Sequence, residues 1–574
     1  MRNIIAFKAG SFIGLLSALA VASPAVSIYA AVTPPGVTAG SILRDQQNQT
    51  KQPRQLPQSE KVKEQSATKS EMGALVSVKD FTFSGYEGVA TEPELQALVA
   101  DAKGKTITFG ELKALTNKIT THFNKKGWFR ARAYLPKQDV TDGIIEIAVI
   151  QGASDGGLDL KLDRTARICQ NVLRDIGETA VRKGEPLNEQ ELERSVLLMN
   201  DLPGVIARVS MAQGTIPGTT RVSLAVSEGP MLSGVLFGDN YGNHYTGAFR
   251  VNTTVAINDP FRYGDQVSAL LTEAEGLVQG RIGYSLPILF PGLRAMVSYT
   301  GMNYELGGEF TALNYKGSSN NVDAGLTYAL VRSRTSNLWT ALSYQYKVLV
   351  DTKAGADISD KQLHSVTLSA NGDHYDKFWG GGSITYNVGA TTGNLHESIA
   401  PTGREGQYTR FNAGLTRVQR LADGVSLNVS GVAQKALDNL ENSEQLSLGG
   451  PFGIRAYPVG EASGDEGQLV SADLRFNIPL AAKYGTLQAS GFFDAGHITL
   501  NKDRFAGDVL NDSNRNDYWL QGAGVGFNYI FTERGAVRAS WAHVIGTNPG
   551  QRLGKNSDGQ NDKSRFWLQG EIYF

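Results

Sequence analysis

The chain of 574 residues has one cysteine, Cys169, and only 7 histidines. A single cysteine excludes an intrachain disulfide and a metal site built from cysteines. The histidines form no H-x-x-x-H or H-E-x-x-H pair, so no metal site is expected. After the N-terminal region, no stretch reaches the roughly 18 apolar residues that indicate a membrane-spanning helix.

The chain also lacks an excess of positive or negative charge. The 55 Lys and Arg residues nearly balance 56 Asp and Glu residues, which gives a formal net charge of -1 and no indication of a nucleic acid partner. The chain contains no Walker sequence and no G-x-S-x-G elbow. Gly522-x-Gly524-x-Gly526 lacks the spacing and the following helix of a dinucleotide loop. We therefore expect no catalytic residues and no cofactor.

The N-terminal region indicates a secretory signal. Arg2 and Lys8 precede an apolar run that ends at Ala22, and candidate cleavage sites follow Ala22 or Ala30. Because this apolar run is about 14 residues long, it falls short of the ~20 residues of a spanning helix. A cleaved signal peptide over residues 1–30 is therefore favoured over a membrane anchor.

A helix and a linker are expected next. Within residues 31–50, the stretch from Ser41 to Gln49 has helix-forming composition, with Ser41 as a candidate N-cap followed by Ile42 and Leu43. Residues 51–75 are rich in polar residues and have almost nothing to bury, so they are expected to form a flexible linker. A helix on such a tether can occupy one place and leave it.

Two consecutive segments, residues 76–152 and 153–230, predict small α/β domains with a similar order of elements. Capping boxes, Thr91–Glu94 and Thr108–Glu111, predict two helices in the first segment. In the second, helices are expected from Thr165 to Leu173, with Cys169 as a buried apolar residue, and after Asn188. Alternation and β-branching predict strands at 76–83, 128–135, 144–150, 158–162, 205–211 and 221–226.

Strand-like alternation replaces the helical period from residue 231 to 574. In one segment, an apolar face opposes a face that is mostly small or polar: Val525, Phe527, Tyr529 and Phe531 against Gly524, Gly526, Asn528 and Ile530. Lipid outside and water inside require such faces, although a soluble β-sandwich can show the same period. The last ten residues, Arg565–Phe574, end on an aromatic and resemble the C-terminal signal of outer-membrane barrels. We predict a closed transmembrane antiparallel β-barrel of about 16 strands.

Several motifs lie within this framework. They are Leu197–Val205, Asp239–Asn243, Thr246-Gly247 with Arg250, Asn258–Pro260 with Gly264-Asp265, Leu448–Tyr457 with Gly464-Asp465, and Gly491–Gly496. Together they resemble the two-partner secretion transporters, the TpsB proteins of the ShlB/FhaC/HecB type. In that family two POTRA domains precede the barrel, and the resemblance covers essentially the whole chain after the signal peptide.

The resemblance also implies a site. Ile454, Arg455, Ala456 and Tyr457 resemble the family's loop-tip pattern Val-Arg-Gly-Tyr, with Ile454 in place of valine and Ala456 in place of glycine, and Phe492, Asp494 and Gly496 match its barrel-wall motif. The family pattern implies a salt bridge between Arg455 and Asp494, whereas the residue types alone fit two separately solvated side chains. A guanidinium fork matches a carboxylate bidentately, so such a pair would fix the loop. The resemblance further implies that the N-terminal helix plugs the barrel at rest.

The implied function is export of a large secreted TpsA-type exoprotein across the outer membrane, without nucleotide hydrolysis. The POTRA domains would lie in the periplasm and add an extended segment of the client as a strand. Outer-membrane lipids and the barrel-assembly machinery are the other expected partners, and the protein is expected to be a monomer. Alternatives are a barrel-assembly factor of the same plan, a passive porin and, third, a lumenal hydrolase.

Overall fold

The computed structural model describes residues 37–50, 75–399, 402–481, 484–505, 508, 510–531 and 534–574. The predicted signal peptide and nearly all of the predicted linker lie outside these residues. Among the helices in the described residues, none is both long enough and apolar enough to cross a membrane.

The first α/β unit is built on a three-stranded sheet, β2-β5-β4, in which β2 and β5 are parallel. Its elements are β1 (Leu75–Ser77), β2 (Asp80–Ser84), α2 (Glu92–Val99), η1 (Ala100–Ala102), β3 (Thr106–Thr108), α3 (Phe109–Lys125), β4 (Arg132–Tyr134) and β5 (Ile144–Ile150). The predicted capping box starts α3, because the Thr108 hydroxyl accepts from the Glu111 N–H and the Glu111 carboxylate accepts from the Thr108 N–H. Phe81, Phe123 and Ile145 are buried in its core.

Two strand predictions in this unit were wrong in extent. The strand expected at 76–83 is divided into β1, which pairs with β3, and β2, which pairs with β5. The strand expected at 128–135 is reduced to β4, because the Ala131 N–H donates to the Trp128 carbonyl at 3.0 Å and closes a turn there.

The second α/β unit has the sheet order β6-β8-β7. Its elements are β6 (Ser154–Leu162), α4 (Gln170–Gly177), α5 (Glu189–Asn200), β7 (Val205–Gln213) and β8 (Thr220–Glu228). The predicted helix from Thr165 to Leu173 was wrong in register. The buried Glu228 carboxylate accepts hydrogen bonds from the Arg167 and Ile168 N–H groups, so the chain stays in a turn until α4 begins. Cys169 is therefore at the N-cap position and only half-buried.

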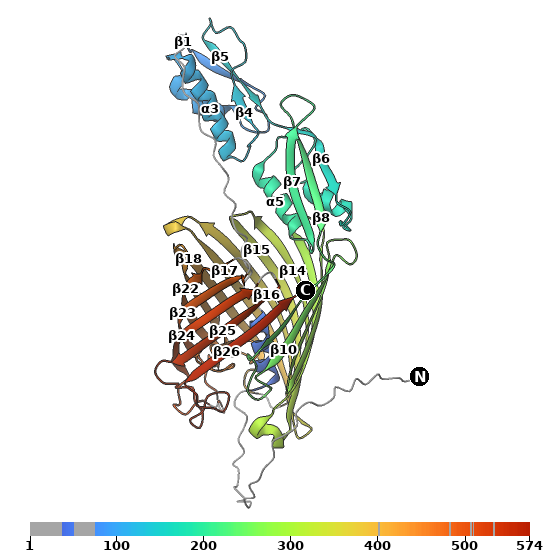
Figure 1. The fold of residues 1–574 in the computed structure, drawn as a ribbon, viewed down its shortest axis with the longest axis vertical. Helices are drawn as coiled ribbons and strands as arrows, with labels where there is room; N and C mark the ends of the chain where they lie inside the picture. Colours follow the sequence, from blue (N-terminus) through green and yellow to red (C-terminus); the bar gives the residue numbers. More distant parts are fainter. Residues whose placement is uncertain are drawn as a thin grey trace, which may run out of the picture. The chain divides into compact units, whose positions relative to one another are not determined.

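Sixteen antiparallel strands close into one barrel (Figure 1). They are β9 (Leu232–Asp239), β10 (Arg250–Asn258), β11 (Gln266–Ala274), β12 (Leu277–Pro287), β13 (Leu293–Glu305), β14 (Tyr315–Arg332), β15 (Ser336–Lys353), β16 (Ala356–Asp376), β17 (Gly382–Ile399), β18 (Gly406–Ala422), β19 (Val425–Ala436), β22 (Glu466–Ile478), β23 (Thr486–Thr499), β24 (Asp517–Phe531), β25 (Gly535–Val544) and β26 (Ser564–Tyr573). The barrel closes where β26 pairs with β9, from Gln569 opposite Asp239 to Tyr573 opposite Val235. Closure satisfies the backbone groups that an open edge would leave unpaired in lipid.

The two faces of the barrel wall differ in polarity as the alternation predicts. In β26, Phe566, Leu568 and Ile572 are exposed on the outer face, whereas Gln569 and Glu571 are buried on the inner face. The C-terminal residues thus supply apolar groups to the lipid side and polar groups to the interior.

Connections at the end where β9 begins have at most seven residues, whereas the other end carries two-residue turns, such as 275–276, as well as the longest connections. Among the short ones are residues 259–265 and η3 (Phe378–Gly380), and among the longer ones are η2 (Gly308–Leu313) with its flanks and residues 437–465. The last of these carries a small hairpin of β20 (Leu446–Ser447) and β21 (Ser463–Gly464). It folds back onto inward-facing side chains of the wall, as does the helix α1 (Ala39–Thr50).

Candidate functional site

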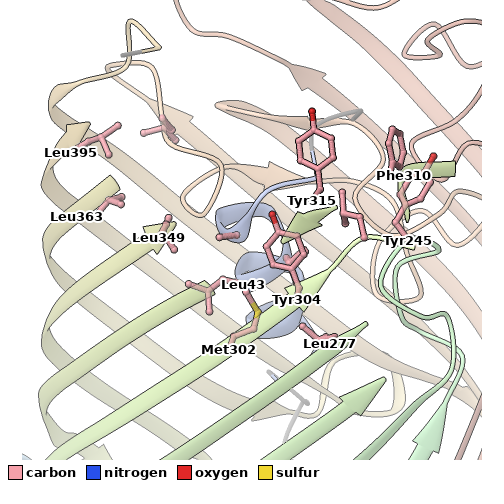
Figure 2. Close-up of a cluster of buried hydrophobic side chains, with 14 of the residues drawn as sticks. Leu43, Tyr245, Leu277, Met302, Tyr304, Phe310, Tyr315, Leu349, Leu363 and Leu395 are labelled. Atoms are coloured by element: carbon pink, nitrogen blue, oxygen red, sulfur yellow. The ribbon is translucent and has the colours of Figure 1, made fainter. Parts of the chain in front are cut away.

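The helix α1 lies inside the barrel, against inward-facing side chains (Figure 2). Leu43 is fully buried and Ile42 nearly so. Their surroundings are apolar side chains of the strands and loops: Tyr245, Leu277, Met302, Tyr304, Leu306, Phe310, Tyr315, Leu349, Leu363, Leu395, Tyr408, Ala436 and Leu440. An apolar helix face thus meets a patch of apolar side chains on the inner side of the barrel.

The start of α1 is held by a strand carboxylate. The Ala39 N–H donates to Asp351 Oδ1 at 2.8 Å, and the Tyr304 hydroxyl donates to the same oxygen at 2.7 Å. A carboxylate is favourable there because it faces the unpaired amides and the positive end of the helix dipole. The helix begins before the predicted cap, Ser41, whose N–H instead donates to the Thr38 hydroxyl at 3.2 Å. Ser41 is buried in the first turn.

The inward-folded loop, residues 437–465, also contacts α1. Arg44 Nη1 donates to the Asn442 carbonyl at 3.2 Å, and the Asn442 side chain donates to Thr38 Oγ1 at 3.1 Å. Gly40 faces Glu441 so closely that a Cβ at position 40 would lie 2.5 Å from its Oε1. The helix α1 and this loop therefore occupy the interior as packed neighbours.

The loop tip brings the predicted motif to the barrel wall. Ile454 and Tyr457 are fully buried, and the Tyr457 N–H donates to the Ile454 carbonyl at 3.0 Å. The Ile454 N–H donates to the Leu448 carbonyl at 2.6 Å, which folds the tip back on the start of its own hairpin. This compact turn directs Arg455 toward β23.

Arg455 and Asp494 form a two-pronged ion pair. Nε of Arg455 lies 2.9 Å from Asp494 Oδ2 and Nη2 lies 2.7 Å from Oδ1, while the Arg455 N–H donates to Oδ2 at 3.0 Å. The Asp494 side chain is fully buried. Main chain and side chain of one loop residue thus bind one wall carboxylate, which fixes both the position and the orientation of the tip.

Further wall groups complete this contact. Asp473 Oδ1 accepts from Arg455 Nη2 at 2.8 Å, and the Ser471 hydroxyl donates to Asp494 Oδ1 at 2.6 Å. The guanidinium carbon lies 3.3 Å from the centre of the Phe492 ring, within cation–π range. From β26, Trp567 Nε1 donates to the Arg455 carbonyl at 2.7 Å. The tip is therefore bound on several sides.

Glycines in the wall make room for the loop. A Cβ on Gly522 would lie 2.5 Å from the Cβ of Ala456, and a Cβ on Gly496 would lie 3.0 Å from Leu448 Cδ1. Gly496, predicted as part of the wall motif, therefore contacts the hairpin rather than the guanidinium. Gly522 lies in the Gly-x-Gly-x-Gly segment, and its lack of a side chain leaves the space that Ala456 occupies.

The sequence reading missed a group of buried ion pairs between loop and wall. Lys347 Nζ lies 2.6 Å from Glu444 Oε1, and Arg410 Nε lies 2.7 Å from Glu444 Oε2. Lys361 lies 3.5 Å from Glu441. Alternation in β15, β16 and β18 places these cations inward, but their acidic partners lie in an irregular loop that offers no such pattern.

The comparisons decide the family. The family model described as haemolysin secretion/activation protein ShlB/FhaC/HecB matches residues 218–529, more than half of the chain. The chain belongs to this family. A second model, POTRA domain of the ShlB type, matches residues 76–152. This ShlB/FhaC/HecB-type protein is thus an outer-membrane transporter of two-partner secretion, with its POTRA domains in the periplasm.

Relatives of this transporter extend over most of its length. The heme/hemopexin transporter protein HuxB of Haemophilus influenzae (strain 86-028NP) is 26% identical over 489 residues, 83% of each chain. The outer membrane transporter CdiB of Escherichia coli is 23% identical over 448 residues, 75% of this chain and 74% of that one.

Solved structures show the same fold. CdiB from Escherichia coli gives a TM-score of 0.75 at 20% sequence identity and covers 95% of this chain and 100% of that chain. CdiB from Acinetobacter baumannii gives a TM-score of 0.66 at 18% identity, with 92% and 96% covered.

Proposed function

We propose that this transporter captures an unfolded, large TpsA-type exoprotein with its periplasmic domains and passes it through the barrel lumen after α1 has left. The observation that supports the proposal is the position of α1 inside the barrel. Ala39 at its start and Leu43 on its apolar face are fully buried among lumenal side chains. A helix in this position blocks the interior, so transport of any chain requires its departure.

The contacts of α1 fit a removable plug. Its apolar face is small, and its polar contacts with the wall are single hydrogen bonds, such as the one from the Ala39 N–H to Asp351 and the one from Arg250 Nη1 to Gln46 Oε1. Each such bond to a charged group contributes about 1.5–3 kcal/mol net, because water replaces it on release. The predicted flexible linker, residues 51–75, would allow the helix to leave without detaching from the chain.

The POTRA sheets support capture by strand addition. The outer strands of the two sheets, β2 and β4 in the first and β6 and β7 in the second, each have one sheet neighbour. Such strands can accept an extended segment through backbone hydrogen bonds that demand little of its sequence. Selectivity would come from side chains next to that edge.

The Arg455–Asp494 pair would hold the loop in one arrangement while the lumen is plugged. Because a buried pair contributes more to position than to stability, its role would lie in the transport cycle rather than in the barrel fold. Direction would come from folding of the client outside, without nucleotide hydrolysis and without an enzymatic step. The same proposal includes insertion by the barrel-assembly machinery through the C-terminal strand, and action as a monomer, since β26 pairs with β9 of its own chain.

Co-expression with a very large secreted protein from the neighbouring reading frame tests the proposal. The whole chain should release that protein into the medium, and deletion of residues 76–229 should abolish release. Deletion of residues 31–72 should raise ion conductance in planar bilayers and leave the assembly of other barrels unchanged. If loss of this chain instead reduced outer-membrane barrels in general, the protein would be an assembly factor.

A further inference from the structure

A groove of about 870 Å³ runs along the barrel wall, over the strands from β15 to β23. Its floor consists of small side chains, Ala370, Ala390, Ala413 and Ala433. Bulkier apolar side chains, Leu368, Val388 and Phe411, flank this floor. The end of the groove toward β23 is polar and is lined by Lys435, Glu466, Gln468, His497 and Thr499.

Strand register shows that the groove is on the lipid side. Asp494 faces the interior, and directly paired residues of antiparallel strands share a face, so Ser471, Ser430, Thr416 and Thr385 also face inward. Residues an odd number of positions away along each strand face outward. Ala433, Ala413 and Val388 meet that condition, each three positions away. The groove therefore opens toward the membrane and not toward the transport path.

The polar end of the groove lies at the extracellular ends of the strands. Lys435 is one residue from the end of β19, Glu466 starts β22 and Thr499 ends β23. Lys435 Nζ lies 2.7 Å from one Glu466 oxygen, and Lys502 Nζ lies 3.9 Å from the other. Two ammonium groups thus share one carboxylate, which leaves N–H donors for an anionic group, while the acidic side chain beyond Thr499 in this row, Asp517, lies 3.8 Å from His497.

The other end descends along the wall. The register runs from Gln468 through Ala433, Ala413 and Val388 to Ala370, and Thr340 near the periplasmic start of β15 follows. Between Gln468 at one end of this row and Thr340 at the other, all four side chains are apolar. An occupant therefore needs an anionic head at the outer surface and an apolar chain directed into the bilayer, which is the orientation of an outer-leaflet lipid.

We propose that this groove binds a phosphorylated, acylated glycolipid of the outer leaflet. Its phosphate would lie at Lys435 and Lys502, and one acyl chain would lie over Ala390, Ala413 and Ala433. Trp519, whose ring centre is 5.2 Å from that of His497, would flank the headgroup at the membrane interface. Bound lipid would cover the wall on the side where β19 and β22 carry the inward-folded loop.

Native mass spectrometry of the full chain with bisphosphorylated lipid A tests the proposal. Ala433→Phe fills the floor, and the double variant Lys435→Gln with Lys502→Gln removes the positive charge. Each should reduce the lipid-bound fraction roughly threefold or more. With dephosphorylated lipid A, the double variant should bind as the unaltered chain does.

Two matched controls are available. Ala539→Phe alters another outward alanine, which pairs with the exposed Phe527 and Leu568. Lys316→Gln alters another strand-end lysine, which lies 3.1 Å from Glu305. Both should keep the original bound fraction. Equal binding by the groove variants, or an equal fall in the controls, would overturn the site, and equal groove-dependent binding of phosphatidylglycerol would overturn its assignment to a glycolipid.

Discussion

Ala456 at the loop tip and Gly522 in the barrel wall share one space. A Cβ at position 522 would lie 2.5 Å from the Cβ of Ala456, far inside the ~3.5–4.0 Å at which carbon atoms pack. The alanine that departs from the TpsB pattern Val-Arg-Gly-Tyr therefore fits because β24 has no side chain opposite it. The position of the tip depends on both residues.

Gly522→Ala should displace the loop tip and reduce secretion of the exoprotein. Adding Ala456→Gly should restore secretion, because it removes the opposing methyl group. Contacting residues of this kind couple by about 0.5–3 kcal/mol. The measurement is the amount of exoprotein in the medium for each single variant and for the double variant.

Gly491→Ala is the control for that substitution. Gly491 lies in β23, and no atom lies within 4 Å of a Cβ placed there. Its secretion level should stay unchanged. Additive losses in the Gly522 and Ala456 variants, with no rescue in the double variant, would contradict the shared space.

Arg455→Ala and Asp494→Ala should each depress secretion while the barrel still inserts. Removing one partner leaves the other as an unpaired buried charge, which costs about 3–5 kcal/mol at the loop–wall contact. Arg455→Lys should fail to rescue, because one ammonium cannot replace the two-pronged contact with Asp494. Secretion and heat-modifiable gel mobility measure the two effects separately.

Arg417→Ala provides a matched control, because Arg417 pairs with Asp376 away from the loop. It should secrete normally. Normal secretion in both the Arg455 and Asp494 variants would remove the proposed role of the pair, whereas loss of the heat-modifiable form would place the effect on barrel folding.

Gly40→Leu should unseat the plug helix. The side chain would meet the buried Glu441 carboxylate at 2.5 Å, and overpacking of this kind costs about 1–3 kcal/mol. Since the seated helix blocks the lumen, channel openings in planar bilayers should become more frequent, up to the level of a variant without residues 39–50. Gly280→Ala, where a Cβ meets no atom within 4 Å, should leave conductance at its original level. Identical traces for the Gly40 and Gly280 variants would contradict the plug.

The sequence predicts regular elements better than the contacts between them. The count of about 16 strands follows from the length of the alternating segment, residues 231–574, and capping boxes locate α3, because the alternation and the caps are local signals. The start of α4 was missed because it depends on Glu228, some sixty residues away in the chain. The partner of Arg455 was available only through family resemblance, and Asp351 as the partner of α1 gave no signal at all. Contacts across a lumen depend on barrel closure, which no local pattern encodes.

Asp259, in the turn between β10 and β11, should make stability depend on pH. Burial raises its pKa from 3.8 to about 6, and the nearby Glu228 and Asp265 carboxylates add to the shift, against a hydrogen bond from the Gly264 N–H. Because the folded pKa lies above the unfolded one, the protonated group is favoured on folding. Its contribution is fully present below pH 3.8 and is lost as pH rises through 6.

Asp259→Asn keeps an acceptor for the Gly264 N–H, which now donates to Asp259 Oδ1 at 2.6 Å, and it suits the positive φ of 55° at this position. The variant should therefore be more stable than the original chain at pH 8, by up to about 3 kcal/mol for a shift of roughly two units. The difference should shrink toward pH 4, where the carboxyl is protonated in the folded state and about half protonated in the unfolded chain. The midpoint of heat-modifiable unfolding, measured from pH 4 to pH 8, checks this. A stability difference that does not change with pH would show that the buried charge of Asp259 is not its cause.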